Sequence, residues 1–160
     1  MSLHDEIKAV LDDYIAKWNV YDIPGMKALW DSDEAEPIYV AEERDPIIGW
    51  QAMETYWGGG AKTSTHLIKY SDLMARKAAD DVAHAFYRLH WNVYIPGGAY
   101  PRPIGNSVRV TSLLRKKPAG WRLFHHIEAP EASIIQLRKA HERAVDPELF
   151  EMLKKKGITF

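Results

Sequence analysis

The stretch SVRVTSLLRKKPAGWRLFHHIEAP, residues 107–130, predicts a β-hairpin and thereby decides the class of fold. Apolar and polar residues alternate up to Lys117, which is typical of a strand with one buried face. Pro118-Ala119-Gly120 then supplies a tight turn, and a second strand follows until Pro130 stops it. We therefore expect this hairpin to be the last pair of strands in an antiparallel sheet.

Outward from the hairpin, two long stretches predict strands at 65–78 and 82–95. Apolar residues at helical spacing predict a helix at 3–19, and Asp22 followed by Ile23-Pro24 is typical of the start of a second helix. The further expected elements are a strand at 37–43 and helices at 48–57, 131–144 and 146–157.

This order predicts an α+β fold, a cone-shaped, curved antiparallel sheet with helices packed on its concave face. At 160 residues we expect one domain, with a core at 3–130 and a C-terminal helical extension at 131–157. The extension carries apolar stripes, so we expect it either to cap a pocket or to pack on a neighbouring subunit. A curved sheet with an apolar outer face favours a homodimer or homotrimer.

Composition and charge exclude several classes of function. The net charge of -1 gives no electrostatic case for binding nucleic acid or an anionic membrane, and no apolar run has the length of a membrane span. The absence of cysteine excludes disulfides and thiolate metal sites. His125 and His126 point to opposite faces of one strand, so we expect no metal and no other cofactor. The acidic N-terminal helix is unlike a signal peptide, which favours the cytoplasm.

Aromatic side chains gather where the mouth of the cone is expected, at Tyr39, Trp50, Tyr56 and Trp57. Each one alone is most simply a core residue, but together they favour a flat, hydrophobic, aromatic ligand, because stacking rewards flat apolar molecules. No nucleic-acid or membrane partner is expected beside this small-molecule substrate.

The strand at 82–95 has one polar and one apolar face, and the sequence leaves open which of them lines the cavity. A polar row suits a wet pocket, so we assign His90 and Asn92 to the cavity wall. Glu42 and Glu43, which follow the short strand at 37–43, are most simply solvated.

The order of elements and the hairpin at 107–130 resemble the nuclear transport factor 2-like superfamily, which includes the SnoaL-like polyketide cyclases, ketosteroid isomerase and scytalone dehydratase. The resemblance covers residues 3–130. Enzymes, non-catalytic binders and kinase association domains all use this cone, so the resemblance implies the fold and not one activity.

Two segments are similar in more detail to the scytalone dehydratase and hexachlorocyclohexane dehydrochlorinase branch. Tyr21-Asp22-Ile23-Pro24-Gly25 is similar to the stretch in which an aspartate supports the catalytic histidine, and Thr65-His66-Leu67-Ile68 matches the position of that histidine. The resemblance therefore implies an Asp22–His66 dyad, with the Tyr21 hydroxyl contacting the substrate. From the residues alone, Asp22 is equally well a helix N-cap and His66 a polar strand residue.

Several positions depart from that branch. Asn92 stands where scytalone dehydratase has a second histidine, and Arg109 and Thr111 fall near its serine and asparagine. An arginine there favours an anionic group or a developing oxyanion, so Arg109 joins the expected catalytic set. The side chains expected to contact the substrate are Trp18, Tyr39, Trp57, His90, Asn92, Tyr94, Thr111 and His125.

These residues predict a cofactor-independent lyase that acts on a hydrophobic aromatic small molecule by elimination, dehydration or carbon–carbon cleavage. His66, oriented by Asp22, moves the proton, while Tyr21 and Arg109 stabilise developing charge. Two alternatives stay open. One is an isomerase or cyclase with a similar pocket, and the other is a non-catalytic small-molecule-binding or assembly domain.

Overall fold

The computed structural model describes residues 2–59, 64–98 and 101–158, and its chain forms two compact units, Met1–Pro130 and Glu131–Phe160. The described elements of the first unit are α1 (Leu3–Asn19), α2 (Ile23–Ala28), β1 (Ile38–Val40), β2 (Ile47–Ile48), α3 (Trp50–Gly58), β3 (Thr65–Lys77), β4 (Val82–Tyr94), β5 (Ile104–Lys117) and β6 (Gly120–Pro130). Those of the second unit are α4 (Ser133–Arg143) and α5 (Pro147–Lys155).

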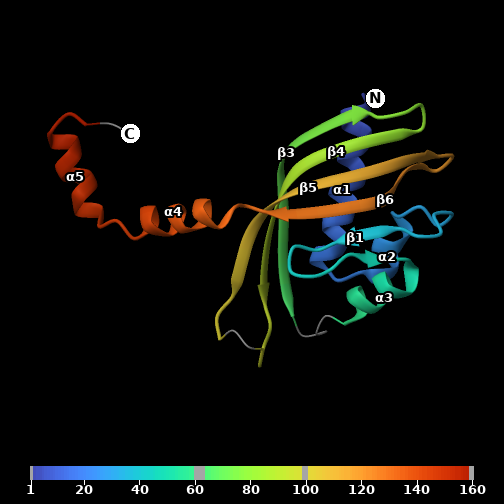
Figure 1. Ribbon diagram of the computed structural model, residues 1–160, viewed down its shortest axis with the longest axis horizontal. Helices are drawn as coiled ribbons and strands as arrows, with labels where there is room; N and C mark the ends of the chain where they lie inside the picture. The colour runs from blue at the N-terminus through green and yellow to red at the C-terminus, as the bar shows by residue number, and fades with distance from the viewer. Residues whose placement is uncertain (1, 60–63, 99–100, 159–160) are drawn as a thin grey trace. The chain divides into compact units, whose positions relative to one another are not determined.

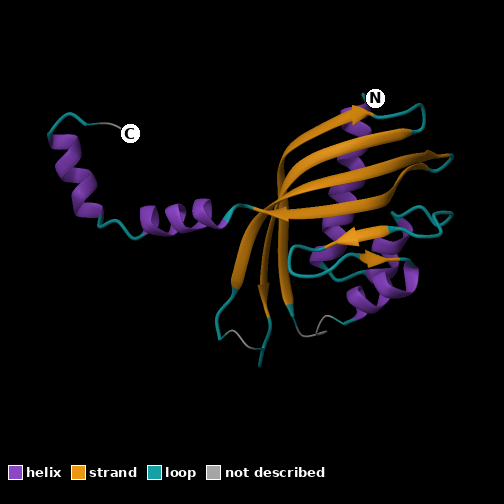
Figure 2. Cartoon of the chain, in the orientation of Figure 1, coloured by secondary structure: helices purple, strands orange, loops and turns teal. Residues whose placement is uncertain are grey.

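The strands of the first unit form one curved sheet in the order β2-β1-β6-β5-β4-β3 (Figures 1 and 2). The long strands β3 to β6 make the expected antiparallel meander, and the α+β class is confirmed. The sheet is mixed, however, because β1 pairs parallel with β6, with Tyr39 beside His126. The short strand β2 was not predicted, because a stretch of two residues carries no periodic signal.

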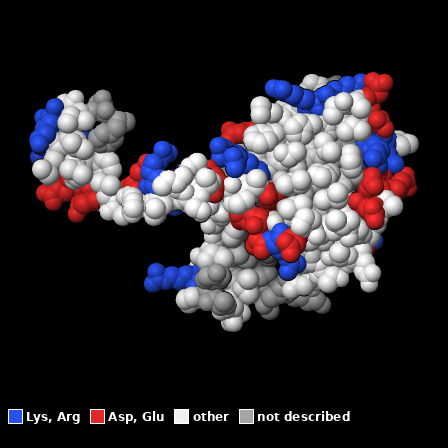
Figure 3. Space-filling model, in the orientation of Figure 1, with Lys and Arg blue, Asp and Glu red and all other residues white. Residues whose placement is uncertain are grey.

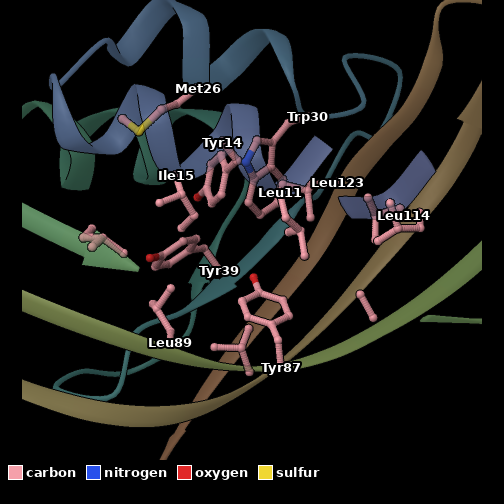
Figure 4. Close-up of a cluster of buried hydrophobic side chains, with 14 of the residues drawn as sticks. Leu11, Tyr14, Ile15, Met26, Trp30, Tyr39, Tyr87, Leu89, Leu114 and Leu123 are labelled. Atoms are coloured by element: carbon pink, nitrogen blue, oxygen red, sulfur yellow. The ribbon is translucent and has the colours of Figure 1, made fainter. Parts of the chain in front are cut away.

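Helix α1 covers the inner face of this sheet (Figure 1). Ser2 and Asp5 form a capping box at its start, which satisfies backbone N–H groups that the helix cannot pair itself. Its buried stripe of Ile7, Leu11 and Tyr14 packs into the core shown in Figure 4. The helix that the spacing of apolar residues predicts thus covers the inner face of the curved sheet.

The end of α1 is fastened to the edge strand β3 by one side chain. The Asn19 amide donates to the carbonyl of Ile68 at 3.0 Å, and the N–H of Ile68 donates to the Asn19 carbonyl oxygen at 2.6 Å. Asn19 thereby imitates a neighbouring strand and satisfies both backbone groups of Ile68. This attachment fixes the part of β3 that carries His66.

At the other end of the sheet, a buried carboxylate ties the loop after α2 to β5. Asp31 is 1% exposed, and its carboxylate accepts from Arg115 at 2.6 Å and pairs with Lys117 at 2.9 Å. Burial alone would raise the pKa of Asp31, but the hydrogen bonds from Lys117 and Arg115 outweigh it and hold that pKa below 3.8. Elsewhere on the face seen in Figure 3, acidic and basic side chains are interspersed.

The second unit consists of two amphipathic helices that bury no side chain of their own. Ile134 on α4 is 71% exposed, and Leu149 and Met152 on α5 are also exposed. The expectation that these helices cap a pocket or pack on a neighbouring subunit stays a prediction. In the described ranges, no helix combines the length and the apolar character that crossing a bilayer requires.

Replacing Asp31 by Asn should lower the free energy of unfolding by about 2 kcal/mol, because Arg115 and Lys117 lose their buried counter-charge. Asp33→Asn is the matched control, since Asp33 pairs with the same Lys117 but is largely exposed, and it should cost about 0.5 kcal/mol or less. Urea unfolding at pH 7 measures both values.

The difference between wild type and the Asp31 variant should also disappear as the pH falls. A carboxyl whose pKa is lowered by folding stabilises the protein above its unfolded-state pKa, and that contribution is lost through the folded-state pKa. Equal destabilisation by both variants at pH 7 would contradict the structural role of Asp31.

Candidate functional site

A cavity of about 1490 Å³ opens between the helices and the inner face of the sheet in the first unit. This exceeds the range of about 300–1,000 Å³ usual for small-molecule sites, so a flat polycyclic molecule has room. Residues of α1, α3, the β1–β2 segment and the four long strands form its walls. Most of the wall is aromatic or aliphatic, with Tyr14, Ile15, Trp18, Tyr39, Tyr56, Trp57, Ile68, Leu89 and Trp91 among the lining residues.

A buried polar network interrupts this apolar wall, and the carboxylate of Glu128 is its centre. Oε1 of Glu128 accepts from the hydroxyl of Tyr39 at 3.0 Å and lies 3.2 Å from Nε2 of His126. Glu128 is 9% exposed and His126 1% exposed, and both line the cavity. Among the described residues no group bonds to the second carboxylate oxygen, Oε2. Oε1 is therefore held in place in a side chain that lines the cavity.

Strand geometry explains why these groups meet. His126 and Glu128 are two residues apart in β6, so both face inward. The parallel register of β1 places Tyr39 beside His126, and the two rings stack with their centroids 4.8 Å apart. Burial, together with the charge of Glu128, raises the pKa of Tyr39 well above its usual value, so Tyr39 remains a hydrogen-bond donor.

The second ring nitrogen of His126 is held as well. Nδ1 lies 3.2 Å from the hydroxyl of Ser112, which stands directly opposite on β5, and 3.5 Å from the hydroxyl of Tyr87. The hydroxyls of Ser112 and Tyr87 are themselves 3.3 Å apart. Because both nitrogens have neighbours, the imidazole is fixed in orientation and in turn fixes the carboxylate of Glu128.

Two buried donors in the cavity wall have no hydrogen-bond partner in the described part of the chain, the Tyr14 hydroxyl and the Trp57 indole N–H. The ring of Tyr14 lies 6.3 Å from that of His126, and Figure 4 shows its hydroxyl pointing away from α1 toward Tyr39. Burial raises the pKa of Tyr14. An unpaired buried donor costs about 1–3 kcal/mol, which an oxygen atom of a ligand would recover.

His66 lies farther along the wall, in a stack of rings. Its imidazole stacks on Tyr21 with centroids 5.5 Å apart, and the centroid of the Trp18 ring is 6.3 Å away. Nε2 of His66 is 2.7 Å from the hydroxyl of Ser64. Burial lowers the pKa of His66 from its ordinary 6.5, which favours the neutral ring at pH 7. Tyr21 adopts a left-handed backbone, with φ of 57°, and donates to the carbonyl of Trp57.

Asp22 is exposed and acts as the N-cap of α2. Its carboxylate accepts from the backbone N–H of Gly25 at 3.0 Å. The side chains of Asp22 and His66, both in described ranges, share no hydrogen bond or ion pair. The dyad implied by the resemblance therefore stays a prediction, and the contacts present are those of a helix cap and of a histidine beside Ser64.

The structure decides which face of β4 lines the cavity. Ala83, Ala85, Tyr87 and Leu89 are buried on the inner face, so the polar face with His90 points outward. This corrects the expected assignment of His90, whose Nε2 lies 3.1 Å from the hydroxyl of Ser71 instead. The inner face is the apolar one because it packs on α1.

Other expected contacts also fall outside the cavity. Arg109 is exposed and donates to the carbonyl of Pro130 at 3.1 Å. Tyr94 is 41% exposed, and Thr111 and His125 belong to the outer face of β5 and β6, in line with the outward side chains of β4. The expected residues that do line the cavity are Trp18, Tyr21, Tyr39, Trp57, His66 and Asn92.

Glu42, which we expected to be solvated, accepts two side-chain hydrogen bonds. Its carboxylate accepts from the Trp91 indole at 2.6 Å and from the Asn106 amide at 2.9 Å. Burial raises the pKa of Glu42, although those two hydrogen bonds act against the rise. The contact fastens the turn after β1 to β4 and β5, beside the cavity.

Sequence reasoning missed Glu128 and Tyr14 and noted His126 only as half of a histidine pair. The alternation His126-Ile127-Glu128 puts two titratable side chains on one face of the strand. Regular alternation would place them opposite Trp121 and Leu123, and the register shift beside Phe124, which brings all four inward, has no local sequence signal. In the ranges that the structure describes, no group of three or more His, Asp or Glu side chains is arranged to hold a metal ion.

The family model described as a SnoaL-like domain matches residues 7–130, and the chain belongs to this family. The match spans the first compact unit and stops before α4. A search of curated proteins gives no match.

Solved structures with the same fold carry different names. A nuclear transport factor 2-like superfamily protein from Salmonella enterica is 18% identical over 81% of this chain and 92% of its own, with a TM-score of 0.70. A candidate dehydratase of the same family from Streptomyces avermitilis is 13% identical over 80% and 96%, with a TM-score of 0.67. A ketosteroid isomerase-like protein from Erwinia carotovora is 16% identical over 81% and 96%, also at 0.67. Such identities show the fold alone.

Asp22→Asn should leave the pKa of His66 unchanged, because the Asp22 carboxylate contacts Gly25 and not the imidazole. A carboxylate within hydrogen-bond reach would raise the pKa of His66, so its removal would lower that pKa by roughly 1–3. NMR titration of the His66 ring in both proteins measures this. Because asparagine also caps a helix, the variant should match wild type in stability. A clearly lower pKa of His66 in the variant would establish the dyad.

Proposed function

We propose that this protein binds a flat, hydrophobic small molecule and catalyses a cofactor-free elimination, such as a dehydration, by moving a proton. The arrangement of Glu128 carries the proposal. Oε1 is held by Tyr39 and His126, Oε2 has no hydrogen-bond partner among the described residues, and the side chain lines an apolar cavity. A base fixed in this way needs no reorientation when substrate binds, which is the main contribution of positioning to catalysis.

The neighbouring side chains suggest a division of roles. Oε2 of Glu128 takes a proton from a carbon atom of the substrate. The Tyr14 hydroxyl, which has no partner in the described chain, donates to the oxygen on which negative charge develops. His66, beside Ser64, is the second acid–base group: its protonated form donates a proton to the departing hydroxyl, which leaves as water.

A non-catalytic binding domain is the second candidate. The size of the cavity and the unpaired Trp57 indole N–H would serve binding alone. An isomerase would use the same proton transfer without the loss of a leaving group, so it is a variant of the first proposal and not a third.

We also propose that the protein works as a homodimer or homotrimer, with the outer face of the sheet as the contact between copies. Leu67 and Met74, which alternate onto this face of β3, are 51% and 50% exposed. Large apolar side chains exposed on the outer face of a sheet are available for burial against another copy.

The proton transfer can be tested with 5-nitrobenzisoxazole, a flat aromatic molecule that releases a coloured phenolate when a base removes its carbon proton. Glu128→Gln should reduce the rate by about 10²-fold or more, because general-base catalysis of this kind contributes about 10²–10⁴-fold. Glu36→Gln, an exposed carboxylate outside the cavity, is the matched control and should leave the rate unchanged.

Glutamine keeps the oxygen that accepts from Tyr39, so the melting temperature of the Glu128 variant should remain close to that of wild type. A His66→Gln variant assayed in parallel separates the two candidate bases. If only His66→Gln loses activity, the sequence-based assignment of His66 as the base is favoured. If the wild-type protein gives no rate above buffer, the binding domain is favoured.

A further inference from the structure

Arg44 lines the same cavity at its opening, in the turn between β1 and β2. Its guanidinium lies over the ring of Tyr56, 5.1 Å from the centroid. Stacking of this kind holds the flat guanidinium in one plane and leaves its N–H edge free to bind.

Arg44 stands between Glu43 and Asp45 in the sequence, but within the part of the chain that the structure describes no carboxylate forms an ion pair with its guanidinium. The adjacent Glu43 accepts from the hydroxyl of Tyr56 at 3.1 Å, and no ion pair joins it to Arg44. The cavity wall therefore presents a cation without a paired counter-charge beside largely apolar surface.

A continuous row of rings runs from this cation to the buried carboxylate. Arg44 covers Tyr56, the centroids of Tyr56 and Tyr39 are 5.4 Å apart, and Tyr39 stacks on His126 at 4.8 Å. Tyr39 also donates to Glu128. A flat ligand lying along this row would meet the carboxylate of Glu128 at its inner end. At its outer end it would meet the guanidinium of Arg44, with the carboxylate of Glu43 already bonded to the Tyr56 hydroxyl.

The charges of Glu128 and Arg44 at the two ends of this row would determine which way round a charged ligand binds. A carboxylate placed beside Glu128 would be repelled in a region of low dielectric, whereas the same group at the opening would meet the guanidinium of Arg44. Arginine binds a carboxylate through two parallel hydrogen bonds, which fixes direction as well as charge.

We propose that Arg44 determines ligand specificity, and that the ligand is a flat, hydrophobic acid whose carboxylate binds at Arg44. Its opposite end reaches Glu128. The inference rests on the proposed function only in taking the cavity as the binding site, and it does not depend on whether a reaction follows.

The test uses two probes of the same shape, 2-naphthoate and neutral 2-naphthol, with binding followed by quenching of tryptophan fluorescence at pH 7.5. Arg44→Gln should weaken binding of 2-naphthoate roughly three- to tenfold, the range for a partly exposed charge-assisted pair, and leave 2-naphthol within about twofold. Arg76→Gln is the matched control, because Arg76 is exposed on β3 in register with His84 on the outer face. It should change neither affinity.

The dependence of binding on ionic strength gives a second measurement. Binding of 2-naphthoate to wild type should weaken as ionic strength rises, and this dependence should be lost in Arg44→Gln. Equal effects of Arg44→Gln on both probes, or none on either, would overturn the inference while leaving the cavity as a binding site. Failure of both probes to bind wild type would overturn the proposed binding function as well.

Discussion

The carboxylate of Glu128 faces an apolar cavity and is held there by the hydroxyl of Tyr39 and the ring of His126. A buried charge is costly unless it is paired or hydrogen-bonded, so these contacts make the position possible. They require β1 to join the sheet parallel to β6, because only that register brings Tyr39 to His126. The attachment of the short first strand, far away in sequence, therefore completes both the sheet and the site.

The same constraint explains what the sequence could predict. Alternation in the hairpin at 107–130 and the Pro-Ala-Gly turn specify an antiparallel pair by local physics, and Asp22 before Ile23-Pro24 specifies a helix start. Pairing between β1 and β6 depends on contacts between distant segments, which no local pattern encodes. His90, which we assigned to the cavity wall, instead lies beside Ser71 on the outward face of β4, because a polar row suits an open surface as well as a wet pocket.

Some of the site residues expected from the sequence line the cavity, and others do not. Trp18, Tyr21 and His66 do line the cavity, and Tyr21 and His66 come from the segments at which the resemblance pointed. What the sequence could not reveal was the role of Glu128, since a glutamate in the last strand is unremarkable until its face and its neighbours are known. Because SnoaL-like relatives of low identity share only the fold, the function of this member has to be argued from that pocket.

The central claim is that Oε2 of Glu128 is available to a molecule bound in the cavity. A crystal structure of the wild-type protein grown with 2-naphthol tests it most directly. We predict the naphthalene ring in the cavity, with its hydroxyl within hydrogen-bond distance of Glu128 Oε2. A cavity filled by the protein's own side chains, or Oε2 paired with another residue, would contradict it.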